Sequence, residues 1–475
     1  MIAQDFDQLD PIDLPRALPV DPSAVIDGAI APPPISIPDP ETWVETLDAY
    51  LGVFNGYSAV LVAAFFVTLC ATPLMRRLAV AYGIIDRPND PRKIHRIPIA
   101  YLGGVGVYLG IMAGIIVSYA AAAIPGLITP HDGAVLDPAT NQPEAVPPSI
   151  VIGLSVIMLI GLLDDIAGIT PRYKIAGQIF AAAALALDNV GVNVARGLLA
   201  PTIGELLGNR DLVYMIDVPL LSEPIGIDLI YWTGTAVIAV FVLGACNASN
   251  LIDGLDGLLS GVTGIATAGL LVIGIMIIFT EGAAGPRDAQ RIVLTLAVLG
   301  ACLGFLPHNF NPATIFLGDC GSLLLGFATI VIVLTLGDQG RTDFVVAGLV
   351  VYAIPIIDTL LAIVRRKMSG KRMSDADSDH LHHMLKRALG VKGAVLTLYG
   401  IGAGFAFLGV LLAMSGARVV YSMAFVFTAF LMVYSTKIAR MRAIEEQARS
   451  YDAAKAAAAD PDGAGQVEGS AAAKG

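Results

Sequence analysis

Residues 229–257 read Leu-Ile-Tyr-Trp-Thr-Gly-Thr-Ala-Val-Ile-Ala-Val-Phe-Val-Leu-Gly-Ala-Cys, followed by Asn-Ala-Ser-Asn-Leu-Ile-Asp-Gly-Leu-Asp-Gly. The first 18 residues are almost entirely apolar. Because about 20 apolar residues span a bilayer as a helix, they predict a transmembrane helix. The residues that follow predict a polar, glycine-containing end to that helix.

Ten further apolar runs occur, and the composition agrees with them. Hydrophobic residues make up 56% of the 475-residue chain and charged residues only 15%, against roughly a quarter charged in soluble domains. We predict an all-α polytopic membrane protein with about eleven transmembrane helices, and exclude a soluble globule, collagen, a coiled coil and a disulfide scaffold. The runs lie near residues 56–75, 99–122, 149–163, 175–187, 229–246, 258–280, 291–307, 320–336, 344–364, 395–414 and 419–436.

The basic residues predict the orientation. Of the 29 Lys and Arg, 22 fall in the connections after the first, third and ninth runs and in the C-terminal tail. Cytoplasmic loops carry an excess of Lys and Arg, so these segments are predicted to be cytoplasmic. An odd number of spans then leaves the N-terminus outside.

The segments outside the spans predict three regions. Residues 1–50 hold ten acidic residues and nine prolines, which is typical of a disordered arm, and they lack the pattern of a signal peptide. Residues 51–440 form the membrane domain, and 441–475 form a partly disordered tail. Residues 188–228 predict a small hairpin or surface helix on the outside. The net charge of −11 gives no support to a nucleic-acid partner.

Ionisable groups beside membrane spans mark functional sites, and five predicted cytoplasmic segments carry them. In residues 86–98, Arg92, Lys93 and His95 offer donors to phosphate oxygens, although a plain positive-inside loop would look similar. Asp164 and Asp165 end the third run and precede Lys174. Adjacent carboxylates repel each other, so a divalent metal or a lysine is expected beside them, with a helix cap as the alternative for either acid.

Two more segments offer carboxylates. Asn247, Asn250, Asp253 and Asp256 recur every three residues, so on a helix they would form one polar stripe; a stripe joining helices is the poorer alternative. Asp319 opens the eighth run between glycines, where it could be an N-cap or approach a metal.

The remaining features are aromatic or imidazole side chains. Phe316 could stack on a nucleotide base. Three of the six histidines lie in His380-Leu-His382-His383. Their spacing does not suit structural zinc, and donors to a diphosphate fit better, with the acid Asp358 behind them.

Taken together and in this order, the five segments resemble the polyprenyl-phosphate N-acetylhexosamine-1-phosphate transferase superfamily over about residues 56–436. The motif of residues 380–383 resembles that of the transferases that initiate enterobacterial antigen and teichoic acid, whereas the muramyl-pentapeptide branch carries three consecutive histidines. One departure is Gly168, which stands where many members have a third acid. A role of that acid in metal binding therefore cannot be carried over.

The resemblance implies a bacterial inner-membrane enzyme that transfers sugar 1-phosphate from a UDP-N-acetylhexosamine, with UDP-N-acetylglucosamine favoured, to undecaprenyl phosphate, releasing UMP and starting cell-envelope glycan synthesis. It implies Mg²⁺, with Mn²⁺ as the alternative, and leaves a homodimer open. The residues it implies are Asp164, Asp165, Asp253 and Asp256 for catalysis, Asp319 and Asp165 for the metal, and Lys93, His95, Lys174, Asn247, Asn250, Phe316, His380, His382 and His383 for substrate binding.

Two alternatives remain open. A phospho-muramoyl-pentapeptide transferase would share most of these motifs. A secondary transporter also places acids and amides in broken helices, but near the bilayer midplane, whereas these residues are predicted to gather at one membrane face.

Overall fold

The computed structural model describes residues 40–86, 98–136, 144–216, 225–280, 282, 284–368 and 381–423, and scattered positions from 425 to 448. Contacts divide the chain into two units, Met1–Asp48 and Ala49–Gly475. The described part of the first unit is the beginning of a helix that starts at Pro40. Residues 40–50, which the sequence assigned to the N-terminal arm, are therefore helical.

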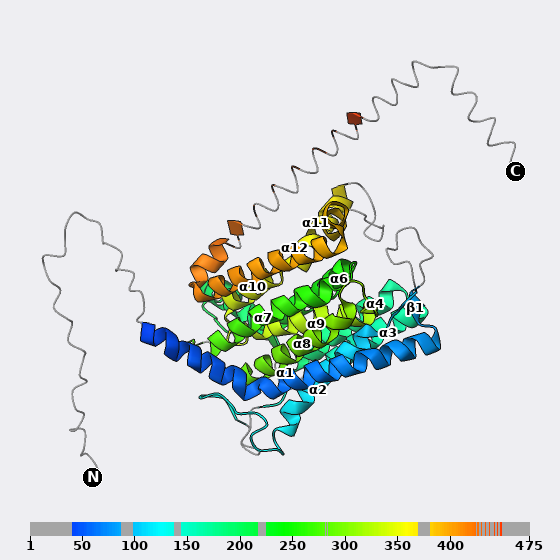
Figure 1. Ribbon diagram of the computed structural model, residues 1–475. Helices are drawn as coiled ribbons and strands as arrows, with labels where there is room; N and C mark the ends of the chain where they lie inside the picture. Colours follow the sequence, from blue (N-terminus) through cyan, green and yellow to red (C-terminus); the bar gives the residue numbers. More distant parts are fainter. Residues whose placement is uncertain are drawn as a thin grey trace, which may run out of the picture. The chain divides into compact units, whose positions relative to one another are not determined.

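The described chain is mostly helical, with two short antiparallel ribbons, as Figure 1 shows. The helices are α1 (Pro40–Tyr82), α2 (Gly103–Ala120), α3 (Pro148–Ala167), α4 (Pro171–Leu187), α5 (Asn193–Leu199), the π-helical turn η2 (Ala200–Gly204), α6 (Leu229–Ile252), α7 (Leu258–Ile278), α8 (Asp288–Asn309), α9 (Gly318–Thr335), α10 (Thr342–Val351), α11 (Ala353–Met368) and α12 (Leu381–Met414). The strands are β1 (Ile85–Asp86), β2 (Ile99–Ala100), β3 (Val213–Ile216) and β4 (Ile225–Asp228).

Eight described helices are long and apolar enough to cross a membrane, or nine if α10 and α11, bent by 80° at their junction, form one span. The prediction of a polytopic helical membrane protein is therefore confirmed. The predicted count of eleven is not: α4 has only 17 residues, and half of the residues of 419–436 lie outside the described part of the chain. The orientation stays a prediction.

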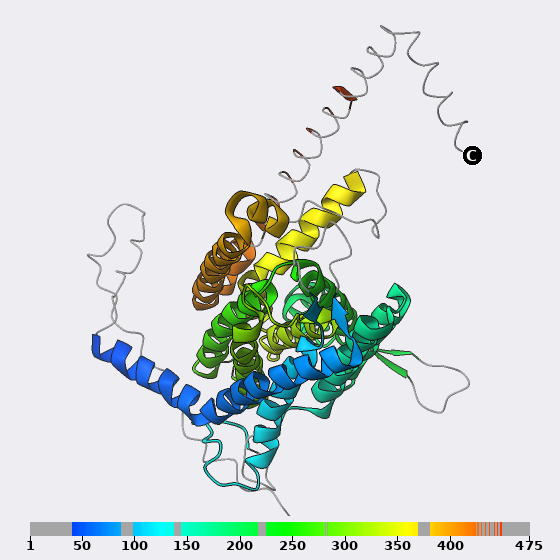
Figure 2. The ribbon, with the colours of Figure 1, turned by 45° about the vertical axis from the view of Figure 1, so that its right-hand side comes forward.

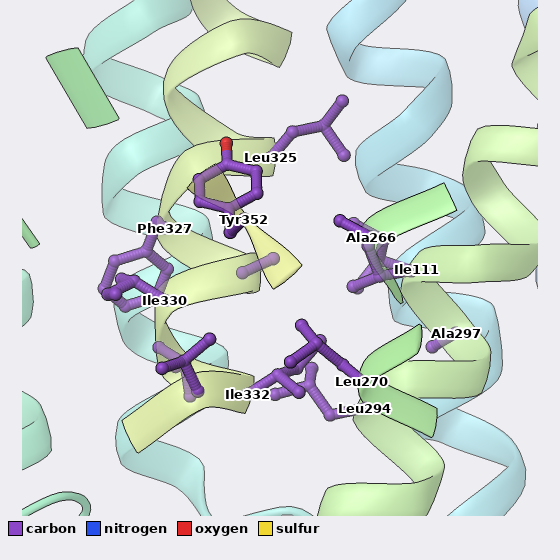
Figure 3. Close-up of a cluster of buried hydrophobic side chains, with 14 of the residues drawn as sticks. Ile111, Ala266, Leu270, Leu294, Ala297, Leu325, Phe327, Ile330, Ile332 and Tyr352 are labelled. Carbon is purple, nitrogen blue, oxygen red and sulfur yellow. The ribbon is translucent and has the colours of Figure 1, made fainter. Parts of the chain in front are cut away.

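Helix α9 lies at the centre of the core. In its most apolar window 89% of the residues are buried, against 28% for α3. Figure 3 shows Leu325 and Phe327 pointing to different sides of α9, with Ile111 of α2 and Leu270 of α7 on the side away from Phe327. Burial on all sides suits a helix that is apolar around its circumference, so the beginning of α9 is held in place by its neighbours.

Two segments far apart in the sequence meet where α2 and α9 begin. The Phe316 N–H donates to the Ala100 carbonyl at 2.9 Å, and the Gly103 N–H donates to the Phe316 carbonyl at 3.0 Å. The ends of α3 and α6 and the beginnings of α4 and α9 lie at this end of the bundle, which is at the right of Figure 1.

The element predicted for residues 188–228 contains both a helix and a hairpin, and its location outside the membrane stays a prediction. Residues 193–204 are helical, and β3 pairs with β4 from Val213↔Asp228 to Ile216↔Ile225. Asp228 then accepts a hydrogen bond from the Tyr231 N–H at 2.9 Å and caps α6. The hairpin therefore leads directly into α6.

Candidate active site

Three charged side chains from three helices meet at the end of the bundle. The ammonium nitrogen of Lys174 lies 2.7 Å from Asp164 Oδ2 and 2.5 Å from Asp319 Oδ2. The other Asp319 oxygen accepts a hydrogen bond from Asn250 Nδ2 at 2.9 Å. The chain therefore brings together four predicted site residues from α3, α4, α6 and α9, separated by up to 155 positions.

Asp165 holds the beginning of α9. Its two carboxylate oxygens accept hydrogen bonds from the backbone N–H groups of Asp319 at 2.8 Å and Cys320 at 3.0 Å. The first N–H groups of a helix lack partners within the helix, and a carboxylate there also interacts favourably with the helix dipole. Asp165 thereby fixes the position of Asp319: the helix cap that the sequence offered as the alternative for this acid is found, but on α9 rather than on a neighbouring helix.

Gly168, the residue that departs from the family pattern, has a structural role at the end of α3. It has a φ of +62° and ends α3, and its N–H donates to the Asp164 carbonyl at 2.8 Å. The next residue, Ile169, donates its N–H to Asp164 Oδ1 at 3.0 Å. Glycine adopts this left-handed conformation without strain, so the turn orients Asp164 from behind.

The expected helical stripe of four polar residues is wrong. Helix α6 ends at Ile252, so Asp253 and Asp256 lie in the connection to α7, named here the acid loop (residues 253–257). Asn247 is on the helix, but its side-chain nitrogen donates to Gln178 of α4 at 3.0 Å. A step of three residues rotates by about −60° on an α-helix, which turns Asn247 away from the direction of Asn250.

The acid loop is tied to the segment before α9. Asp256 Oδ2 accepts hydrogen bonds from Asn311 Nδ2 at 2.8 Å and from the Ala313 N–H at 3.0 Å. The buried Asn309 side chain accepts from the Gly257 N–H at 3.1 Å. Asp256 therefore shapes the loop, while Asp253 has a different environment.

Asp253 lies among other acids. Its burial, followed by the negative charges of Asp319, Asp165 and Asp256, raises the pKa of Asp253 to about 8. Desolvation and like charges both disfavour a carboxylate. The acid loop thus carries a group that a bound cation would help to ionise.

The histidine segment is residues 380–383, and its described part, residues 381–383, packs directly on the acid loop. A Cβ on Gly254 would lie 2.4 Å from His382 Nε2, so only glycine admits this imidazole. His382 is 2% exposed, and the ring of His383 lies 4.2 Å from it. The predicted acid behind them, Asp358, accepts from the Leu381 N–H at 2.9 Å and orients the beginning of α12.

The other predicted residues are placed as follows. Phe316 lies beside Tyr101, with ring centroids 6.1 Å apart, at the junction of α2 and α9. Lys93, His95 and His380 lie outside the described residues. Sequence reasoning missed Asn309 and Tyr399, whose hydroxyl donates to the Gly257 carbonyl. Asn309 comes two residues after Pro307 near the end of the apolar helix α8, a pattern that the sequence shows. No pattern in the sequence marks Tyr399.

The donor set suits a metal with few protein ligands. Among the residues that the structure describes, no three His, Cys, Asp or Glu side chains form a metal-binding group. Mg²⁺ is usually held by one or two carboxylates with water and substrate phosphates. Asp319 already faces a positive charge, that of Lys174, so this carboxylate could hold such a cation.

Comparison with known proteins agrees with this arrangement. Residues 147–337 match the family model of glycosyl transferase family 4. A probable undecaprenyl-phosphate N-acetylglucosaminyl 1-phosphate transferase of Bacillus subtilis is 30% identical over 358 residues, covering 74% of this chain and 85% of that protein. A decaprenyl-phosphate N-acetylglucosaminephosphotransferase of Mycolicibacterium smegmatis is 32% identical over 352 residues, covering 71% and 77%.

A phospho-N-acetylmuramoyl-pentapeptide-transferase of Bacillus cytotoxicus is 27% identical over 360 residues, covering 73% of this chain and 94% of that protein. The family model covers every residue of the acidic cluster from Asp164 to Asp319 and ends before the histidine segment. The chain belongs to glycosyl transferase family 4, the polyprenyl-phosphate N-acetylhexosamine-1-phosphate transferases.

Proposed function

We propose that the protein transfers N-acetylglucosamine 1-phosphate from UDP-N-acetylglucosamine to undecaprenyl phosphate at the cytoplasmic face of the bacterial inner membrane. The observation that carries this proposal is the Lys174 ammonium between the carboxylates of Asp164 and Asp319. A cluster with more acids than described cations needs a further cation before it can receive two phosphate-bearing substrates.

In this reaction an oxygen of the lipid phosphate attacks the β-phosphorus of the UDP-sugar. The bond from that phosphorus to the bridging oxygen breaks, and the oxygen leaves with UMP. Asp319 would hold Mg²⁺, and Asp165 would support it through its hydrogen bonds to the first backbone N–H groups of α9. When bound, Mg²⁺ neutralises charge on the diphosphate, as in other phosphoryl transfers. Asp164 would orient the lipid phosphate or take its proton.

The remaining residues fit substrate binding. Asn250, which donates to Asp319, and the acid loop would lie along the nucleotide. The half-buried Phe316 ring would stack on uracil. His382, which packs against Gly254 of the acid loop, and His383, whose ring lies beside that of His382, would donate to the diphosphate or sugar. Lys174 would contact a phosphate oxygen once the cluster is occupied.

The location of the cluster disfavours a transporter. Asp164 and Asp165 lie in the last turn of α3, and Asp319 lies in the first turn of α9. A transporter would place such groups near the middle of the bilayer, where an alternating-access site is reached from both sides.

The test uses purified protein in detergent with undecaprenyl phosphate, Mg²⁺ and one UDP-sugar at a time. UMP should appear with UDP-N-acetylglucosamine and require Mg²⁺. Release of UMP only with UDP-N-acetylmuramoyl-pentapeptide would transfer the protein to the other branch. No UMP with any UDP-N-acetylhexosamine would defeat the proposed activity.

A further inference from the structure

The outer element, defined here as residues 193–216 and 225–228, lies at the end of α6 opposite Asn250. It is attached to the bundle by a small apolar cluster of Ala195, Leu212 and Ile230, each at most 4% exposed. Figure 2 shows its hairpin extending beyond the helices at the right. The element is therefore anchored at one side and presents its other side outward.

That outward side is apolar. Leu206 is 84% exposed, Met215 69% and Leu207 55%. Leu198 and Ile203 are also exposed; Leu198 lies at the end of α5 and Ile203 in the π-helical turn η2 that follows it.

The charges of the described outer element are neutralised in pairs. Arg196 lies 2.7 Å from Asp211 Oδ1, and Arg210 forms an ion pair with Glu205. Asp228 caps α6. A surface that combines exposed leucines with paired charges is poorly suited to water and well suited to the boundary between headgroups and acyl chains.

Exposed apolar side chains also occur in the span that directly follows the hairpin. Leu229 and Trp232, in the first turn of α6, are 39% and 62% exposed. Tryptophan is enriched at membrane–water interfaces. We infer that the outer element lies in the lipid interface of the leaflet opposite the acidic cluster, with Leu198, Ile203, Leu206, Leu207 and Met215 inserted among the lipids.

Tryptophan fluorescence in phosphatidylcholine vesicles tests this placement. The chain has two tryptophans, so Trp43→Phe with Trp232→Phe provides a dark background for Leu206→Trp. The matched control is Asp211→Trp, because Asp211 is 74% exposed. The variant that retains only Trp232 is the control for a lipid-facing residue. Gel filtration and UMP release report whether each variant is folded.

We expect Leu206→Trp to lose emission in vesicles with brominated acyl chains and to shift to the blue, while Asp211→Trp is quenched by aqueous iodide. Quenching of Leu206→Trp by iodide but not by bromine would overturn the inference. Protection from both quenchers would also overturn it, since a protein, such as a second copy, would then cover the surface. If Leu206→Trp does not fold, Met215→Trp provides the same measurement on the hairpin.

Discussion

The two ends of the helical bundle differ in how well the charges of their acidic side chains are matched by basic side chains. At the end opposite Asp319, named the outer end here after its predicted orientation, Arg291 is 1% exposed and lies 2.7 Å from Asp288 Oδ1, while donating to the Thr335 carbonyl at 2.9 Å. Arg287 lies 3.0 Å from Asp338 Oδ1. In this described network each arginine faces its own aspartate, so the charges cancel within the protein.

At the other end, among the residues that the structure describes, a single ammonium, that of Lys174, serves both Asp164 and Asp319. The charges of Asp165 and Asp319 reach Asp253 as well. A balanced buried network needs no ligand, whereas an unbalanced one is favourable only when a cation completes it. The difference indicates that the outer network stabilises the fold and that the inner one binds.

The largest expected effect is the loss of activity in Asp319→Asn. The variant removes a carboxylate that faces the reacting phosphates, and comparable losses of one stabilising group lower turnover by about 10²–10³-fold. UMP release measures the effect. The matched control is Asp338→Asn at the outer end, which should lower the unfolding temperature and keep turnover. Near-normal turnover of Asp319→Asn would remove Asp319 from the metal site.

Next in size is the effect of Arg291→Met on stability. It leaves Asp288 buried without its partner, which typically costs about 3–5 kcal/mol. Thermal unfolding in detergent measures the change, and turnover per folded molecule should stay the same at low temperature. Adding Asp288→Asn should recover part of the loss. An Arg291→Met protein as stable as the parent would contradict the role given to the outer network.

The raised pKa of Asp253 predicts a pH-dependent effect of Asp253→Asn. Below pH about 4 the acid is protonated in both the folded and the unfolded chain. Between about pH 4 and 8 only the unfolded chain releases the proton, so the parent progressively loses stability that the neutral variant keeps.

The measurement for Asp253→Asn is the unfolding temperature at pH 5 and pH 8 with a chelator present. The advantage of the variant should grow with pH and level off above pH 8, although it releases no UMP. An advantage that shrinks as the pH rises would show that Asp253 is ionised and well partnered in the folded protein.

The smallest effect is expected for Tyr399→Phe, which removes only the hydroxyl that donates to the Gly257 carbonyl. A hydrogen bond contributes about 0.5–1.5 kcal/mol, so turnover should fall by a factor of about 2–10. Thr397→Val is the control, because its hydroxyl bonds only within α12 to Gly393. Equal turnover of both variants would mean that Tyr399 does not position the acid loop.

The sequence alone determined the class of fold and most of the residues of the site. Apolar runs the length of a bilayer, and acids placed at their ends, are local properties of the chain. A divalent metal or a lysine was expected beside Asp164 and Asp165 for the same reason, since adjacent carboxylates need a nearby cation; the structure places Lys174 there. The hairpin at Val213 also followed from local turn and apolar residues.

Only the tertiary structure decided what each polar residue contacts. Asp165 caps a helix that begins 153 residues later, and Asn247 turns to Gln178 because α6 rotates it away from the cluster. Tyr399 reaches Gly257 across 142 residues. Periodicity specifies the direction of a side chain on its own helix, but the partner depends on how separate helices pack, and packing is a property of the assembled chain.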